Sequence, residues 1–167
     1  MKFSTLRSVL KSILVLSVFT VATIESLSAT TYYVSKTGND ANNGLSVANA
    51  KLTITAAANL ATSGSDVIVI STGYYAETIQ VGYSMTFSVD SVQVDQLTMN
   101  KTGITLTIDG NTAPKTFNVK TKITLTDGIV KIGAALAAFR ALDGCTFSGG
   151  GTTSFVDGAL HIGLTSG

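Results

Sequence analysis

The chain has 167 residues, of which 45% are apolar and 13% charged, with one Pro, one Cys and no Trp. This length suits a single domain with a sizeable core, and the composition argues against wholesale disorder. Eleven basic residues against ten acidic ones, without a basic run, disfavour a nucleic-acid partner, and one Cys with one His excludes a disulfide framework and a Cys- or His-rich metal site.

Residues 1–29 are predicted to be a secretory signal peptide. Three basic residues precede a short, mostly apolar run at 13–22, which is the order of a signal peptide. Cleavage after Ala29 would make Thr30 the first residue of the mature chain, and cleavage after Ser28 is the alternative. A helix of this length rises ~15 Å, half of a bilayer core, so a membrane anchor is disfavoured. We therefore expect a secreted protein, extracellular or at the cell surface, whose mature chain has no membrane span.

Residues 30–65 are predicted to form an entry strand, a loop and a capping helix. The helix is expected over 53–61, because its apolar residues recur at helical spacing (Ile54, Ala57, Ala58 and Ala61). Thr53 is the expected N-cap, and Gly64 is the expected stop. The Asn-rich loop at 38–44 does not have the spacing of an EF-hand, and Asx turns explain its composition more simply.

Residues 66–147 contain segments that recur at a nearly constant interval. Apolar residues alternate with Thr or Ser after Met85, Ile104 and Ile123, which are equally spaced in the sequence. This period of two is typical of β-strands. Leu106 is expected to face inward and to contact Phe87 and Leu125 on adjacent coils.

A second series of apolar pairs is interleaved with the first. It begins at Ile79 and continues at Leu97 and Phe117, with nearly the same interval as the first series. Two ladders that advance together are what a β-solenoid requires, since stacked coils share one core. An antiparallel β-sandwich also uses short alternating strands, but it does not need equal spacing. The predicted fold is therefore all-β, a right-handed parallel β-helix of about four coils with a short N-terminal capping helix.

The motifs between residues 31 and 81 add a resemblance. In chain order they read TYYVS at 31–35, GNDANNGLS at 38–46, the Ala-rich helix, DVIVI at 66–70 and GYYAETI at 73–79. This order resembles the N-terminal entry of secreted right-handed parallel β-helix proteins, the pectate-lyase-like superfamily. The chain departs from that pattern where two Pro residues are usual, at Lys36 and at 49–51.

The C-terminal residues resemble another class of β-rich protein. The stretches 123–132 and 152–160 are similar to repeats in large bacterial cell-surface proteins, in which a further β domain follows. We expect the Gly-rich residues 148–167 to begin a further β region, and the chain to be truncated relative to a longer protein.

Three carboxylates are the candidate metal ligands. Asp90 and Asp109 have the same offset on successive predicted coils, so their side chains would stack ~4.8 Å apart, and Asp127, which falls one residue early, would lie nearby. Clustered carboxylates suit calcium, which the resemblance also implies, since pectate lyases hold calcium between acidic residues. In the alternative, Asp109-Gly110 and Asp127-Gly128 are turn dipeptides, a reading that further Asp-Gly pairs outside the ladders favour.

No catalytic residue is assigned. The resemblance implies that a Lys or Arg can remove the proton alpha to a uronate carboxylate, but Lys101 and Lys120 lie in polar turns. Three tyrosines, Tyr74, Tyr75 and Tyr83, are candidates either for stacking on sugars or for packing under the cap.

Two functions remain open. The leading hypothesis is a secreted, non-catalytic structural or carbohydrate-associated module of a bacterial adhesin-like surface protein, with an extracellular polysaccharide as its partner. The alternative is the N-terminal portion of a calcium-dependent, pectate-type polysaccharide lyase whose catalytic coils lie beyond the chain end.

Overall fold

The computed structural model describes residues 28–112, 115–149, 153–156 and 160–162, with the backbone alone in the last two stretches. Residues 1–27 of the predicted signal peptide lie outside the described residues, and so does much of 148–167. No helix in the described part of the chain is long and apolar enough to cross a membrane.

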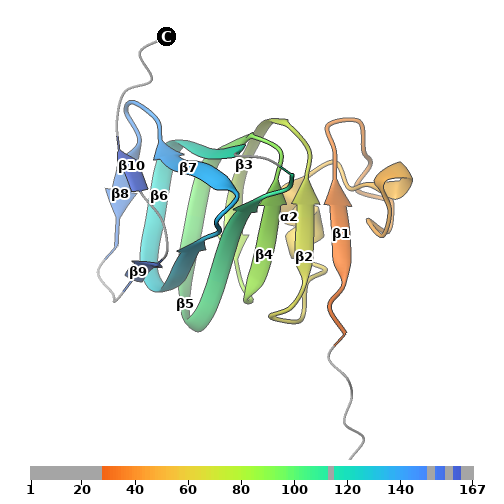
Figure 1. Ribbon diagram of the computed structural model, residues 1–167, viewed down its shortest axis with the longest axis horizontal. Helices are drawn as coiled ribbons and strands as arrows, with labels where there is room; N and C mark the ends of the chain where they lie inside the picture. The colour runs from red at the N-terminus through yellow and green to blue at the C-terminus, as the bar shows by residue number, and fades with distance from the viewer. Residues whose placement is uncertain (1–27, 113–114, 150–152, 157–159, 163–167) are drawn as a thin grey trace, which may run out of the picture.

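The described chain winds into a parallel β-solenoid of about four turns, as predicted (Figure 1). All strand pairs in its ten-stranded sheet are parallel. The strands are β1 Thr31–Val34, β2 Val67–Ile70, β3 Gly73–Val81, β4 Met85–Val89, β5 Val92–Gly110, β6 Lys115–Ile132, β7 Leu136–Ala141, β8 Thr146–Ser148, β9 Thr153–Val156 and β10 Leu160–Ile162. Two short helices, η1 Val47–Asn49 and α2 Ile54–Ala58, lie between β1 and β2.

The strands stack in three ladders, which form three sides of the solenoid. The first ladder runs through β1, β2, β4, the ends of β5 and β6, and β9. The second joins the starts of β3, β5 and β6 to β7 and β10. The third joins the end of β3 to the middle of β5 and β6 and to β8. The strands β5 and β6 each contribute to all three sides, because they continue around the corners (Figure 1).

The spacing between turns grows along the first ladder. In the first ladder, Val67 pairs with Thr86, Thr86 pairs with Thr107, and Thr107 pairs with Lys131, so each interval is longer than the one before it. The constant interval predicted from the sequence is therefore wrong beyond the first turn. The extra residues lie in the corners, for example at 100–104. The alternation of apolar and polar side chains within the strands gives no information about how many residues a corner contains.

The third ladder also departs from a constant interval. Ile79 pairs with Leu97 as predicted, but Leu97 then pairs with Ile123 rather than with Phe117. Phe117 belongs to the second ladder, opposite Val92. The series that begins at Met85 likewise does not continue to Ile123 on the same side of the solenoid.

The core is one continuous column of apolar side chains. Leu106 is fully buried, as predicted, but it lies opposite Met85 and Val130 rather than beside Phe87 and Leu125. On the β4 side the partner is Met85 instead of Phe87, an even shift that keeps the inward face. On the β6 side Val130 lies an odd number of residues beyond Leu125, across a corner, and both side chains are buried. Aromatic rings strengthen the column, with the Phe117 and Phe139 rings stacked at 5.8 Å between centroids.

The predicted capping helix is confirmed as α2. The Thr53 side chain accepts the Ala56 N–H at 3.1 Å, which is the expected N-cap, and Ile54, Ala57 and Ala58 face the core. The helix is shorter than predicted, since Asn59 is already its C-cap.

A loop covers the outer edge of the first strand. Tyr33 donates its N–H to Gly44 and accepts one from Lys51, whose carbonyl accepts the Ser35 N–H. These bonds occupy the edge of β1 that would otherwise be open to pairing. The expected Asx turns are present, because the Asn39 and Asn43 side chains accept the N–H groups of Ala41 and Leu45.

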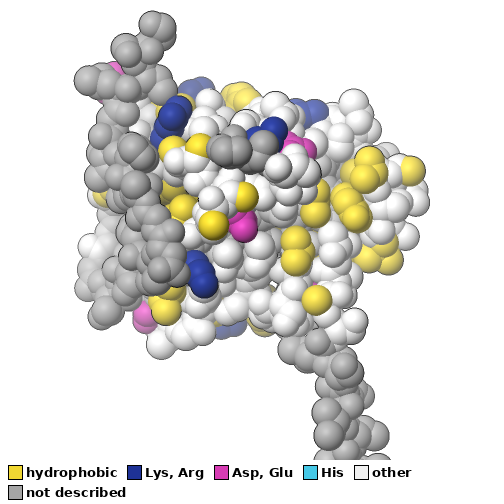
Figure 2. Space-filling view, viewed as in Figure 1, with side chains coloured by type: hydrophobic (Ala, Val, Ile, Leu, Met, Phe, Trp, Pro, Cys, Tyr) yellow, Lys and Arg dark blue, Asp and Glu magenta, His cyan; other side chains and the backbone are white. Residues whose placement is uncertain are grey.

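The last described strands extend the same solenoid. The strand β9 pairs with β6, and β10 pairs with β7, so turns continue past Ile132 into 148–167. On the face shown in Figure 2, basic and acidic side chains are scattered, and hydrophobic side chains gather over the end that carries the β1 loop, where Leu45 and Val47 are exposed.

Candidate functional site

The three predicted metal ligands are not brought together. Asp109 lies opposite Ser88 in the first ladder, whereas Asp127 pairs with Asn100 in the corner that follows the third ladder. Asp90 contacts Asn111 through a side-chain hydrogen bond of 3.4 Å. The predicted stacking of these carboxylates depended on the constant spacing, and it is wrong for the same reason.

Two of the three carboxylates accept hydrogen bonds from neighbouring groups of the protein instead. Asp109 Oδ1 accepts the N–H groups of Gly110 and Ala135, at 2.8 and 2.9 Å. Asp127 accepts the Gly128 N–H and, at 2.6 Å, the Thr102 hydroxyl. Among the residues that the structure describes, no group of three His, Cys, Asp or Glu side chains could hold a metal ion. The Asp109-Gly110 pair ends β5, and the Asp127-Gly128 pair lies in a corner within β6, so neither pair forms a separate turn.

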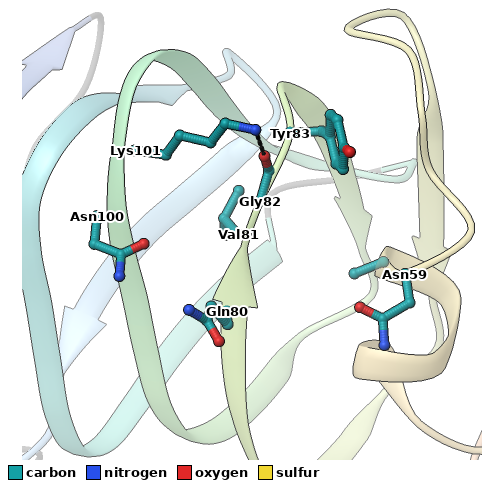
Figure 3. Close-up of a pocket in the computed structure, with 8 residues that line it drawn as sticks. Asn59, Gln80, Val81, Gly82, Tyr83, Asn100 and Lys101 are labelled. Atoms are coloured by element: carbon teal, nitrogen blue, oxygen red, sulfur yellow. Dashed lines mark hydrogen bonds between the residues drawn. The ribbon is translucent and has the colours of Figure 1, made fainter.

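A hollow of about 370 Å³ lies between the end of α2 and the corners of two successive turns (Figure 3). Ala58 and Asn59 come from the helix end, and the remaining lining residues come from β3, β5 and the loop after β3: Gln80, Val81, Gly82, Tyr83, Asn100 and Lys101. The register of the third ladder aligns these corners, since Val81 pairs with Met99. The hollow is thus a product of the stacked turns and their cap.

An aromatic ring and a cation form one wall of this hollow. The Tyr83 side chain is 50% exposed, and the Lys101 Nζ lies 4.4 Å from its ring centroid. Lys101 also donates to the Gly82 carbonyl at 2.9 Å, which holds the ammonium over the ring (Figure 3). Within the described residues, Lys101 has no carboxylate partner. The ammonium therefore remains able to bind an anion.

Three amide side chains surround the same hollow. Asn59, Gln80 and Asn100 are exposed, and they make no side-chain hydrogen bond to another described residue. An amide offers two N–H donors and one carbonyl acceptor, which suits a ligand rich in hydroxyl groups. Asn59 approaches from the helix, and Gln80 and Asn100 come from adjacent turns (Figure 3).

A second Tyr–Lys pair differs in one decisive respect. The Lys120 Nζ lies 4.9 Å from the centroid of the Tyr74 ring, and Tyr74 is 40% exposed. Here the Tyr74 hydroxyl donates to Asp95 and accepts from Lys120 at 3.3 Å. A carboxylate of the protein is thus linked to this pair through the tyrosine hydroxyl. The third candidate, Tyr75, is buried and packs in the core.

Two carboxylates that no sequence motif singles out position the cap. Glu77, on β3, accepts the Ile54 and Thr55 N–H groups at 2.8 and 2.9 Å, and therefore fixes the first turn of α2. Asp40 accepts the N–H groups of Leu52 and Thr53. Glu77 belongs to the GYYAETI motif, but its partners lie in a distant part of the sequence, so no local pattern shows its role.

Comparison with models of protein families, with curated proteins and with solved structures found no match to this chain.

Proposed function

We propose that the chain is a secreted, non-catalytic β-solenoid module of a bacterial adhesin-like surface protein, related to the pectate-lyase-like superfamily. We further propose that it binds an acidic extracellular polysaccharide in the hollow beside Tyr83. The observation that carries this proposal is the Lys101 ammonium, which lies over a half-exposed tyrosine ring without a carboxylate partner among the described residues.

The chemistry of the hollow fits a uronate-type sugar. The apolar C–H face of a sugar ring packs on an aromatic face, and its carboxylate pairs with an ammonium. The amides of Asn59, Gln80 and Asn100 offer donors and acceptors for the ring hydroxyls. A neutral polysaccharide would leave the ammonium without an anionic partner, so the acidic class is favoured.

The same wall argues for binding rather than for cleavage. Among the residues that line the hollow, the ionisable side chains are those of Tyr83 and Lys101. A lysine that acts as a base needs burial or a neighbouring cation, which disfavour its charged form. Lys101 is exposed, and its contacts are a carbonyl and an aromatic ring rather than a second cation.

The experiment is a binding titration of the protein exported from the full-length chain. Oligogalacturonate is compared with its methyl-ester form by calorimetry and by NMR shifts. We expect the acid form to bind, with affinity that falls as salt is added, since exposed charges are screened. Tyr83→Ala and Lys101→Met should each weaken binding about tenfold, which is roughly 1.4 kcal/mol.

The second pair provides the matched control. Tyr74→Ala and Lys120→Met remove the same types of side chain from a site where Asp95 already binds the tyrosine hydroxyl and would repel an anion. Binding should be unchanged in these variants. Equal losses at both pairs, or equal affinity for the methyl ester, would contradict the proposed site.

The alternative function, the N-terminal portion of a calcium-dependent pectate-type lyase, is tested in the same samples. An ultraviolet assay for the unsaturated product of polygalacturonate is run with and without calcium. We expect no product. Calcium-dependent product formation would favour the lyase and contradict the non-catalytic module.

A further inference from the structure

Asp66 is a carboxylate that is almost completely enclosed. Its side chain is 2% exposed, at the turn that precedes β2. Oδ2 accepts the N–H groups of Thr62 and Ser63, at 2.9 and 3.0 Å. Oδ1 accepts the backbone N–H of Thr30 at 2.9 Å. The carboxylate is therefore oriented by its own turn, and one oxygen is directed at the nitrogen of residue 30.

This buried charge is compensated by amides alone. Burial raises the pKa of the Asp66 carboxyl, but three backbone N–H donors outweigh burial and hold the pKa below its usual value. The donors come from the start of β1 and from the turn at 62–66, and no charged side chain contributes. On the β4 side, Thr86 contacts the Asp66 carbonyl rather than its carboxylate. An ammonium at one of these donor positions would add Coulombic attraction to the hydrogen bond that an amide already makes.

Thr30 is where the described fold begins to be fixed. Ser28 and Ala29 are exposed and lie outside regular structure. Thr30 donates to Asp66, and its carbonyl accepts the Val67 N–H at 2.9 Å. The predicted cleavage site thus coincides with the first nitrogen that Asp66 holds.

We infer that Asp66 is the binding site for the α-ammonium that signal-peptide cleavage creates at Thr30. The inference rests on the secretion that is part of the proposed function. A processing peptidase adds water across the Ala29–Thr30 peptide bond, so that the Ala29 carbonyl carbon gains a hydroxyl and the Thr30 nitrogen gains a hydrogen. At neutral pH the new acid releases a proton and the new amine takes one up. The released peptide carries the carboxylate, and Thr30 carries the ammonium.

The cleaved chain then folds with an ion pair where the precursor has a hydrogen bond from a neutral amide to the carboxylate. The backbone bond from Val67 already positions the Thr30 nitrogen, so the pair requires no rearrangement. Cleavage after Ser28 would leave this nitrogen as an amide. The two predicted cleavage sites would therefore give proteins of different stability. The protein cleaved after Ala29 would be the more stable one, because its α-ammonium pairs with Asp66.

The pair has a defined pH dependence. An ordinary α-amine has a pKa of about 7.7–8.0, and an opposite charge at this distance raises it by about one unit or more. Because the folded pKa is raised, the stabilisation is complete below about pH 8 and is lost as the pH rises through the folded value.

The test uses the full-length chain expressed in a secreting bacterial host. The exported protein is sequenced at its N-terminus, and the pKa of its α-amine is measured by NMR. The thermal midpoint is followed from pH 6 to pH 10. The same midpoints are measured for Asp66→Asn and for the native protein after brief periodate treatment, which removes the amine from an N-terminal Thr. If Asp66→Asn does not fold, the comparison of the native protein before and after periodate treatment still tests the ion pair.

We expect a Thr30 N-terminus, a raised amine pKa, and a fall of the midpoint above pH 8 that periodate abolishes. A Thr30 amine with an ordinary pKa, or an exported protein that begins at Ala29, would overturn this inference and leave secretion standing. An exported protein that retains Met1 would overturn the secretion proposal and the inference together.

Discussion

At the N-terminal end, single side chains bind segments that lie outside the strand ladders and therefore lack ladder hydrogen bonds. Asp40, Asp66 and Glu77 each accept two or more N–H groups from segments outside the ladders. Without these acceptors, the donors would be unsatisfied where the chain leaves water. Carboxylates therefore add to the backbone hydrogen bonds that hold the entry segment.

Acid should weaken this arrangement. Burial raises the pKa of Asp40 and of Asp66, but hydrogen bonds from neighbouring N–H groups leave both pKa values lowered. A lowered folded pKa stabilises the fold above the unfolded value of about 3.9, and this contribution is lost as the pH falls through the folded value. We expect the thermal midpoint to fall below about pH 4, and less steeply in the variant with both Asp40→Asn and Asp66→Asn. Asp143→Asn, at an exposed position, is the control, and an unchanged slope in the double variant would refute the assignment.

The core position Leu106 provides a second test. Leu106→Ala removes a fully buried side chain from between Met85 and Val130, and should lower the free energy of unfolding by about 2–5 kcal/mol. Thr105→Ala, one residue earlier on the opposite face, should change it by less than about 0.5 kcal/mol. Chemical denaturation measures both, and similar losses would mean that the inward and outward faces are misassigned.

The helix α2 depends on an element to which it is not adjacent in sequence. A single short helix of this kind is not stable alone, and Glu77 on β3 supplies acceptors for its first N–H groups. Glu77→Ala should therefore lower the free energy of unfolding by about 2 kcal/mol, the scale of hydrogen bonds to a charged group. Thr78→Ala, the exposed neighbour, should have little effect. Equal unfolding midpoints for the two variants would show that Glu77 does not secure the helix.

The strands show what the sequence could and could not predict. Alternation identified the strands and their inward faces, since a period of two is a local property. It could not identify partners, because pairing depends on how many residues each corner contains. Met85 shows the difference, since it faces inward as predicted but pairs with Leu106 instead of with Ile104.

The candidate site was predictable only in part. Tyr83 and Lys101 were singled out from their residue types, but their contact depends on the third-ladder register. Asn59 joins them from the cap, far from Lys101 in the sequence, and no spacing rule relates these positions. The predicted metal ligands are the opposite case. The three aspartates recur at nearly equal intervals in the sequence, but they are not opposite one another in the ladders.

At the scale of the whole molecule, the loop over β1 determines whether that end of the solenoid is available for pairing. A Cβ at Gly38 would lie 2.3 Å from the Lys51 carbonyl oxygen, within the set of bonds that holds the loop. Gly38→Ala should therefore displace the loop and expose the edge of β1, which promotes association between chains. Light scattering against concentration measures the effect. Gly82→Ala, where an added Cβ meets nothing within 4 Å, is the control, and two equally monomeric variants would refute the protective role.

The unequal lengths of the turns have a consequence for how the chain finds its fold. Identical repeats are interchangeable, so a strand can pair with the wrong copy and leave one repeat looped out at little cost. Here the rungs of the first ladder at Val67, Thr86, Thr107 and Lys131 are separated by progressively longer stretches of chain. A strand that paired one turn too far along would form a turn with the wrong number of residues. This would strain the corners or leave inward side chains without matching neighbours. The unequal turn lengths, which prevent prediction of the register from a constant repeat, therefore leave each strand with one pairing position in which its turn closes without strain.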